Sequence, residues 1–270
     1  MEAKIPEPVI KGSFASPETI AHIATQKFMM GSPLYRQEQE WKQNGIEISR
    51  QTMSNWLKKK ACEDWLEPIY EEMKKRLCEY EVLHADETVM QMLKEPGKDA
   101  QSKSYMWLYR TSGEAKHQII LYDYQPDRKH IHPEEFLKGF SGYLHADGYS
   151  GYYKLPEKIT LIGCWAHVRR KFFEAMEALL KEKQATSNAA KGVTYCDKLF
   201  HLEKQFALLC PENLLKEREK QSKPIIDEFY DWVGKLNALP KTHLGKAVQY
   251  AQSQRKYLER YIGLAIRDIK

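Results

Sequence analysis

Apolar residues in the first third of the chain recur every three or four positions, a spacing that predicts amphipathic helices. Ser16-Pro17 has the residue types of an N-cap followed by a first helical residue. Asn44-Gly45 is a typical helix end, and Ser49 is a typical cap for the next helix. The helices expected from these signals span 17–29, 33–43, 49–60 and 61–80.

From residue 81 the apolar positions alternate, which predicts strands. The expected strands cover 81–93, 105–112, 117–124, 142–149 and 159–166, with helices over 132–140 and 166–182. A short aromatic helix is also expected after the fourth strand. Three hairpin-connected strands followed by strands reached through helices predict an α/β fold, a mixed sheet with helices on its faces.

After residue 184 the pattern is helical again, with helices expected near 194–209, 212–238 and 243–266 and a possible break at 222–224. The expected organisation is therefore a lead-in over 1–15, a helical region over 16–80, an α/β core over 81–183 and a helical region over 184–270. The net charge is +5. The last region carries this whole excess, with 15 basic and 10 acidic residues. A basic excess of this size permits an anionic partner.

Composition narrows the class of protein. A hydrophobic content of 42% with 29% charged residues is typical of a soluble globular protein. No apolar run approaches the roughly 18–20 residues of a membrane span, and the N-terminus lacks a secretory signal pattern. The five cysteines are scattered without a C-x-x-C pair, which argues against a zinc ribbon and favours a reducing cytoplasm. We therefore expect a cytoplasmic protein without a membrane partner.

The first region has the order of a helix-turn-helix unit: a helix, a short turn containing glycine, and a capped helix. In such a unit the early side chains of the second helix meet DNA bases. Those side chains would be Arg50, Gln51, Ser54 and Asn55. The residues expected to pack inward are Ile48, Met53, Trp56 and Leu57. The alternative is a three-helix linker whose polar face meets only water.

The tetrapeptide Leu-His-Ala-Asp occurs twice, at 83–86 and at 144–147, each time late in an expected strand. The first and fourth strands of this order are normally neighbours, which would bring Asp86 beside Asp147. Two close carboxylates repel each other unless a cation or proton lies between them, and Mg²⁺ prefers oxygen ligands. The sequence thus predicts a shared metal site. The alternative is that each aspartate caps a turn, as Asp147-Gly148 suggests. The histidines of the two segments are interpreted as packing or hydrogen-bonding residues and not as metal ligands.

Three segments, HADET, HADGYSGY and GCWAHVRRKFFEA, resemble the core of transposases of the insertion-sequence 66 family. Further similar stretches lie in the N-terminal and C-terminal regions, so the resemblance covers nearly the whole chain. It implies a ribonuclease H-like DDE core that cuts and joins DNA with Mg²⁺ or Mn²⁺. Asp86 would be the first catalytic aspartate and Asp147 the second. On the helix AHVRRKFF, phosphate contacts are expected from Arg169, Arg170 and Lys171, unless these form a solvated basic face.

Two departures from the family pattern lead us to expect a chain truncated at both ends. Family members carry a cysteine-containing segment ahead of the helix-turn-helix, and the chain begins after it. Their third carboxylate follows a helical insertion that 184–262 resembles, but the chain then reads GLAIRDIK. Glu174, on the helix directly after the fifth strand, is the candidate substitute, while Asp268 is too near the end to be held rigidly.

The resemblance implies an insertion-sequence transposase that acts on double-stranded DNA, at the element ends and at the target, as a homo-oligomer. Water would attack first and release a 3′-OH, which would then attack target DNA. Two alternatives remain open at this point. One is a catalytically dead DNA-binding remnant or regulator, and the other is a metal-dependent nuclease of the same fold that joins no strands.

Overall fold

The computed structural model describes residue 10 and residues 12–265. Most of the predicted lead-in and all of Asp268 lie outside these residues. The chain divides into two compact units, one up to Lys75 and the other from Arg76 onward. Among the described residues, no helix combines the length and the apolar character that crossing a membrane requires.

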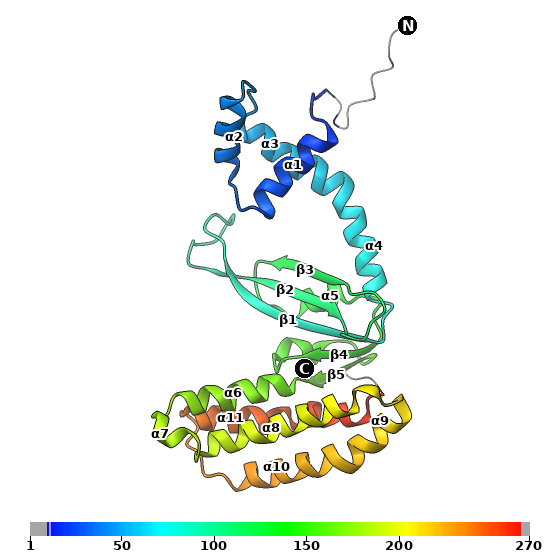
Figure 1. Cartoon of the computed structure of the whole chain (residues 1–270), viewed down its shortest axis with the longest axis vertical. Coiled ribbons are helices and arrows are strands. Elements are labelled where there is room, and N and C mark those ends of the chain that lie inside the picture. Colours follow the sequence, from blue (N-terminus) through cyan, green and yellow to red (C-terminus); the bar gives the residue numbers. More distant parts are fainter. Residues whose placement is uncertain (1–9, 11, 266–270) are drawn as a thin grey trace. The chain divides into compact units, whose positions relative to one another are not determined.

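The first unit is built from helices (Figure 1). Its elements are α1 (Pro17–Phe28), α2 (Leu34–Gln43), α3 (Arg50–Asn55), a π-helical stretch (Trp56–Leu66) and the beginning of α4 (Glu67–Leu77). The predicted caps are confirmed, because the Ser16 and Ser49 hydroxyl oxygens accept the backbone N–H groups of Thr19 and Thr52. All four residues expected to pack inward are buried: Ile48, Met53, Trp56 and Leu57.

The third helix continues beyond Lys60, as expected for residues 61–80. It passes through the π-helical stretch into α4, which ends at Leu77. Neither glycine nor proline occurs between Arg50 and Glu67, so no residue in this segment disfavours continuation. The charged segment that follows is therefore an extension of the third helix.

The second unit contains a five-stranded mixed sheet (Figure 1). Its strands are β1 (Val82–Gln91), β2 (Lys103–Thr111), β3 (Ile120–Gln125), β4 (Gly142–Ala146) and β5 (Ile159–Gly163), in the spatial order β3-β2-β1-β4-β5. The first three strands pair antiparallel, whereas β4 is parallel to both β1 and β5. The predicted adjacency of the first and fourth strands is confirmed, and the sheet is consistent with a ribonuclease H-like fold.

Helices complete the second unit. They are α5 (Ile131–Phe136), α6 (Trp165–Glu177), α7 (Lys181–Gln184), α8 (Asn188–Gln205), α9 (Pro211–Glu217), α10 (Lys223–Lys235) and α11 (His243–Leu258). Four of them, α6, α8, α10 and α11, contribute to a large apolar cluster. Short 3₁₀ or π-helical turns lie at Ser150–Lys154, Phe206–Leu208, Arg218–Ser222 and Glu259–Gly263. The possible break at 222–224 is absent, since the π-helical turn joins α9 to α10.

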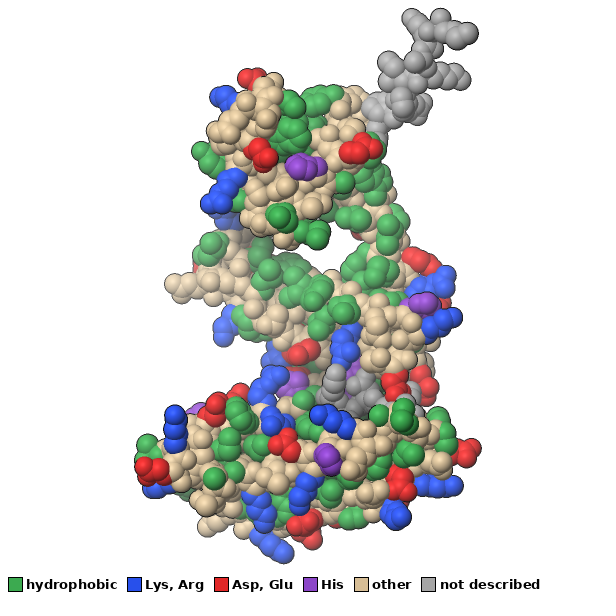
Figure 2. All heavy atoms as spheres, in the orientation of Figure 1, with side chains coloured by type: hydrophobic (Ala, Val, Ile, Leu, Met, Phe, Trp, Pro, Cys, Tyr) green, Lys and Arg blue, Asp and Glu red, His purple; other side chains and the backbone are tan. Residues whose placement is uncertain are grey.

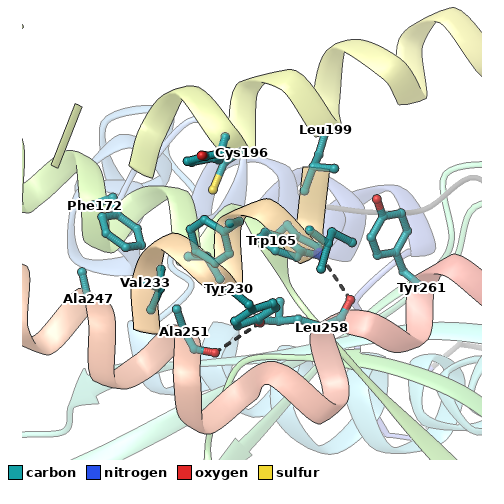
Figure 3. Packing of buried hydrophobic residues seen from close by; sticks show 14 of the residues in the cluster. Trp165, Phe172, Cys196, Leu199, Tyr230, Val233, Ala247, Ala251, Leu258 and Tyr261 are labelled. Carbon is teal, nitrogen blue, oxygen red and sulfur yellow. Dashed lines mark hydrogen bonds between the residues drawn. The ribbon is translucent and has the colours of Figure 1, made fainter. Parts of the chain in front are cut away.

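Trp165, the first residue of α6, lies fully buried in this cluster (Figure 3). Its indole N–H donates to the carbonyl of Leu258 at 3.2 Å, and the Tyr230 hydroxyl donates to the carbonyl of Ala251 at 3.3 Å. These bonds satisfy polar atoms that burial would otherwise leave unpaired. The helices after residue 184 therefore share one core with the helix that follows the sheet.

A buried ion pair also holds these helices. The Arg218 guanidinium is fully buried and donates to both carboxylate oxygens of Glu203, at 2.8 and 2.6 Å. Its remaining nitrogen donates to the carbonyls of Tyr261 and Leu264. On the face of this helical layer drawn in Figure 2, basic and acidic side chains are interspersed. On this face, the basic excess of the last region does not form a uniform patch.

Candidate active site

The repeated Leu-His-Ala-Asp segments lie side by side and in register. In the parallel ladder between β1 and β4, Leu83 pairs with Leu144 and His84 pairs with His145. The same offset aligns Asp86 with Asp147. The two strands differ in length, because β4 ends at Ala146 whereas β1 continues to Gln91. Asp86 therefore lies within its strand and not late in it, while Asp147 directly follows its strand.

One pocket, of about 200 Å³, contains both aspartates. It opens where β4 and β5 end and α6 begins. The charged residues that line it are Asp86, Asp147, Arg110 and Arg170. Ligands in sheets with parallel strands commonly bind at the carboxyl ends of those strands, and this position fits that rule. The pocket thus combines carboxylates suited to a hard cation with guanidinium groups suited to a phosphate.

Three histidines line the same pocket and differ in role from the aspartates. The rings of His84 and His145 stack with centroids 4.8 Å apart, and His145 is buried. His167 lies in the first turn of α6, where burial lowers the pKa of its imidazole and the nearby charges of Asp86 and Asp147 oppose that effect. The stacked pair agrees with a packing role for the two strand histidines.

A further carboxylate, that of Glu87, lies beside this pocket, and the sequence did not single it out. Its side chain is only 1% exposed, and it accepts a hydrogen bond from Arg128 Nε at 2.7 Å and from the Tyr152 hydroxyl at 2.8 Å. Arg128 Nη2 also contacts Glu87 and lies 3.6 Å from Asp147 Oδ2. Burial raises the pKa of Glu87, as does the charge of Asp147, and the Tyr152 and Arg128 hydrogen bonds oppose the shift.

The basic residues predicted on α6 have three different surroundings. Arg170 lines the pocket. Arg169 forms an ion pair with Asp197 of α8, with Nε to Oδ1 at 2.6 Å, and Lys171 Nζ lies 4.9 Å from the ring centroid of Tyr250. Glu174 is exposed and is not among the residues lining the pocket. The structure thus places Arg170 with the two aspartates and leaves the other three outside.

Helix α11 packs against the turn that follows Asp147. A side chain at Gly148 would approach Gln254 and Tyr250 to within 2.9 Å, so only glycine fits there without displacing them. Gln254 Nε2 also donates to the Tyr153 hydroxyl at 2.7 Å. The last helical region therefore contributes to the wall behind the second aspartate.

The carboxylates of the pocket fit a magnesium ion whose remaining ligands are oxygens of water or substrate. Among the residues that the structure describes, no cluster of three or more His, Cys, Asp or Glu side chains is placed to hold a metal. Mg²⁺ is commonly bound by one or two carboxylates, with water and substrate phosphates completing the shell. Asp86 and Asp147 could supply those two carboxylates.

In the first unit, the four residues predicted to meet DNA lie on the outer side of α3. Arg50, Gln51 and Asn55 are exposed, and Ser54 is half-buried. Gln51 Nε2 donates to Asn55 Oδ1 at 3.1 Å, and the Arg50 guanidinium lies 5.7 Å from the ring centroid of Tyr35. This polar face is available to a partner, since its apolar counterpart is buried.

Comparison with known proteins assigns a family. The model of the transposase IS66 family matches residues 12–265. The uncharacterized protein y4qI of Sinorhizobium fredii is 30% identical over 279 residues, covering 97% of this chain and 50% of its own length. The uncharacterized protein y4hP of the same organism is 28% identical, covering 94% and 47%. The chain thus spans about half the length of these curated relatives. No solved structure matches it.

Proposed function

Since the chain belongs to the IS66 family of transposases, we propose that its second unit cuts DNA strands and transfers them, with a divalent cation held by Asp86 and Asp147. The observation that carries this proposal is the in-register ladder that aligns the two aspartates in one pocket with Arg110 and Arg170. Turn caps alone do not require a guanidinium-lined pocket.

The chemistry we propose is hydrolysis followed by transfer. Water attacks a phosphodiester and the bond between phosphorus and the 3′-oxygen breaks, which leaves a 5′-phosphate and a free 3′-OH. This 3′-OH then attacks a phosphodiester of the target, and the target's own 3′-oxygen leaves as the new phosphodiester forms. Mg²⁺ or Mn²⁺, when bound, activates the attacking oxygen and stabilises the leaving one. Asp86 and Asp147 hold the cation and form no covalent intermediate, while Arg110 and Arg170 neutralise phosphate charge.

We further propose that the first unit is the helix-turn-helix-like DNA-binding region and that α3 presents Arg50, Gln51, Ser54 and Asn55 to bases. Its support is the amphipathic packing of α3, with a capped N-terminus and a buried inner face. Arg50→Ala and Asn55→Ala would each weaken binding to specific duplex by about 1–3 kcal/mol. The test is a fluorescence anisotropy titration against a scrambled duplex at several salt concentrations.

The proposed activity is tested with a labelled duplex that carries the DNA flanking the gene, incubated with Mg²⁺ or Mn²⁺. We expect strand cleavage that Asp86→Asn and Asp147→Asn each reduce by at least about 1,000-fold, since removing one catalytic charge commonly costs several kcal/mol. Asp227→Asn, which alters an exposed carboxylate on α10, is the matched control and should leave cleavage unchanged.

The same experiment separates the alternatives. Binding without cleavage at any metal concentration would indicate a DNA-binding remnant or regulator. Cleavage without joined products would indicate a nuclease. Glu174→Gln should leave cleavage unchanged, because the residue is exposed and outside the pocket. A loss as large as that of Asp86→Asn would instead identify Glu174 as the third carboxylate.

A further inference from the structure

We propose that Arg128, anchored by Glu87 and Tyr152, is a positioning residue that fixes the Asp147 carboxylate for cation binding. This inference rests on the proposed function and adds residues to its site. It accounts for the second halves of the HADET and HADGYSGY motifs, to which the sequence assigned no role. Those halves supply Glu87, Tyr149 and Tyr152, while Arg128 comes from the loop between β3 and α5.

The anchor is Glu87, whose side chain is almost completely buried. One carboxylate oxygen accepts from Arg128 Nε at 2.7 Å and the other accepts from the Tyr152 hydroxyl at 2.8 Å. Tyr152 is itself 1% exposed and its ring packs edge-on against Trp107. Glu87 is thus held from both sides, so it can hold Arg128 in turn.

Arg128 is held on two further sides. Its guanidinium lies 4.0 Å from the ring centroid of Tyr149, and its backbone carbonyl accepts a hydrogen bond from the hydroxyl of that tyrosine. A cation over an aromatic face is stabilised by the ring's electrons. Arg128 remains 37% exposed, so these contacts hold the guanidinium without burying it.

The consequence falls on Asp147. Its Oδ1 accepts the Tyr149 backbone N–H at 2.9 Å, and its Oδ2 lies 3.6 Å from Arg128 Nη2. Both oxygens therefore have partners from the same small cluster, which restricts rotation of the carboxylate. Groups that orient a metal ligand in this way typically contribute 10–100-fold to metal affinity or activity.

The test measures Mn²⁺ binding by isothermal titration calorimetry on the full chain, independently of cleavage. Arg128→Lys keeps the charge but loses the planar fork, so Mn²⁺ affinity should fall about tenfold. Combined with Asp147→Asn, it should cause no loss beyond that of Asp147→Asn alone, because both act through one carboxylate. Arg255→Lys, which alters an exposed Arg–Glu pair outside the pocket, is the matched control and should bind like the unsubstituted chain.

Tyr152→Phe provides a second variant that removes a single hydroxyl, and it should weaken Mn²⁺ binding in the same direction and by less. Thermal denaturation of each variant verifies that the chain remains folded. Mn²⁺ affinity that Asp147→Asn lowers and Arg128→Lys leaves within twofold of normal would overturn this inference alone. Absence of Mn²⁺ binding by the unsubstituted chain would overturn both it and the metal site of the proposed function.

Discussion

Two arginine–glutamate pairs in the second unit have the same chemistry and different surroundings. Arg218 and Glu203 join helices of the last region, with the guanidinium fully buried and its further donors paired with backbone carbonyls. Arg128 and Glu87 lie beside the pocket, with a buried carboxylate but a guanidinium that is 37% exposed and faces Asp147. The first pair is complete within the protein, and the second has an open side.

The charge balance of the two pairs explains what each is suited to do. Arg218 with Glu203 sums to zero, and carbonyl dipoles satisfy the remaining donors. Arg128 faces two carboxylates, Glu87 and Asp147, and Asp86 is aligned with the second of these. Arg110 and Arg170 line the same pocket, so the second pair belongs to a wider group of carboxylates and guanidinium groups. Under the proposed function, the Arg218 pair therefore serves stability, whereas the Arg128 pair orients Asp147.

The largest effect is expected from Arg218→Met. The substitution leaves the Glu203 carboxylate buried without its partner, which typically costs about 3–5 kcal/mol. Urea unfolding followed by circular dichroism would measure the loss. Arg218→Met with Glu203→Met should recover most of it, since a well-packed apolar pair can replace a buried ion pair. A double variant as unstable as the single one would show that the backbone carbonyls, rather than Glu203, dominate the cost.

Arg128→Met should cost less stability than Arg218→Met, about 1–3 kcal/mol, because Tyr152 still donates to Glu87 and the site is open to water. The two substitutions should also differ in how their stability costs depend on salt. Raising the ionic strength should shrink the cost of Arg128→Met and leave that of Arg218→Met unchanged, since exposed charges are screened and buried ones are not. Urea unfolding at low and high NaCl measures both. Equal salt dependence would remove the distinction between the two pairs.

The sequence predicted the part of the site that depends on backbone pairing. The repeated Leu-His-Ala-Asp letters and the strand order together implied that Asp86 and Asp147 lie side by side. The β1–β4 ladder confirms the strand adjacency and pairs Leu83 with Leu144 and His84 with His145. Alternation along a strand is local, so it can be read from neighbouring residues. The same alternation predicted the first strand over 81–93, and β1 extends over Val82–Gln91, where it pairs with β2.

The polar network around the site could not be predicted, because its members are far apart in sequence. Arg128 lies 41 residues from Glu87, in a loop with no periodic pattern, and Glu87 lies 65 residues from Tyr152. Of the three basic residues on α6, nothing local distinguishes Arg170, which lines the pocket, from Arg169, which pairs with Asp197. One signal for this network was available in the sequence. Glu87 directly follows Asp86 in the strand, and a buried carboxylate requires a partner.

The smallest loss of stability is expected from a substitution in the loop that carries Arg128. The Arg218 pair has no comparable loop beside it. Burial raises the pKa of Asp127, but hydrogen bonds from Lys129 and His132 outweigh it and lower the pKa to about 2. A lowered carboxyl pKa stabilises the fold above the unfolded value of about 3.8, and this stability disappears as the pH falls toward 2.

Asp127→Asn should therefore cost about 0.2–1 kcal/mol at neutral pH, as for other partly exposed ion pairs. Chemical denaturation across pH 2–7 would measure a difference that closes below about pH 4. A difference that persists to pH 2 would mean that the aspartate acts through its shape and not its charge.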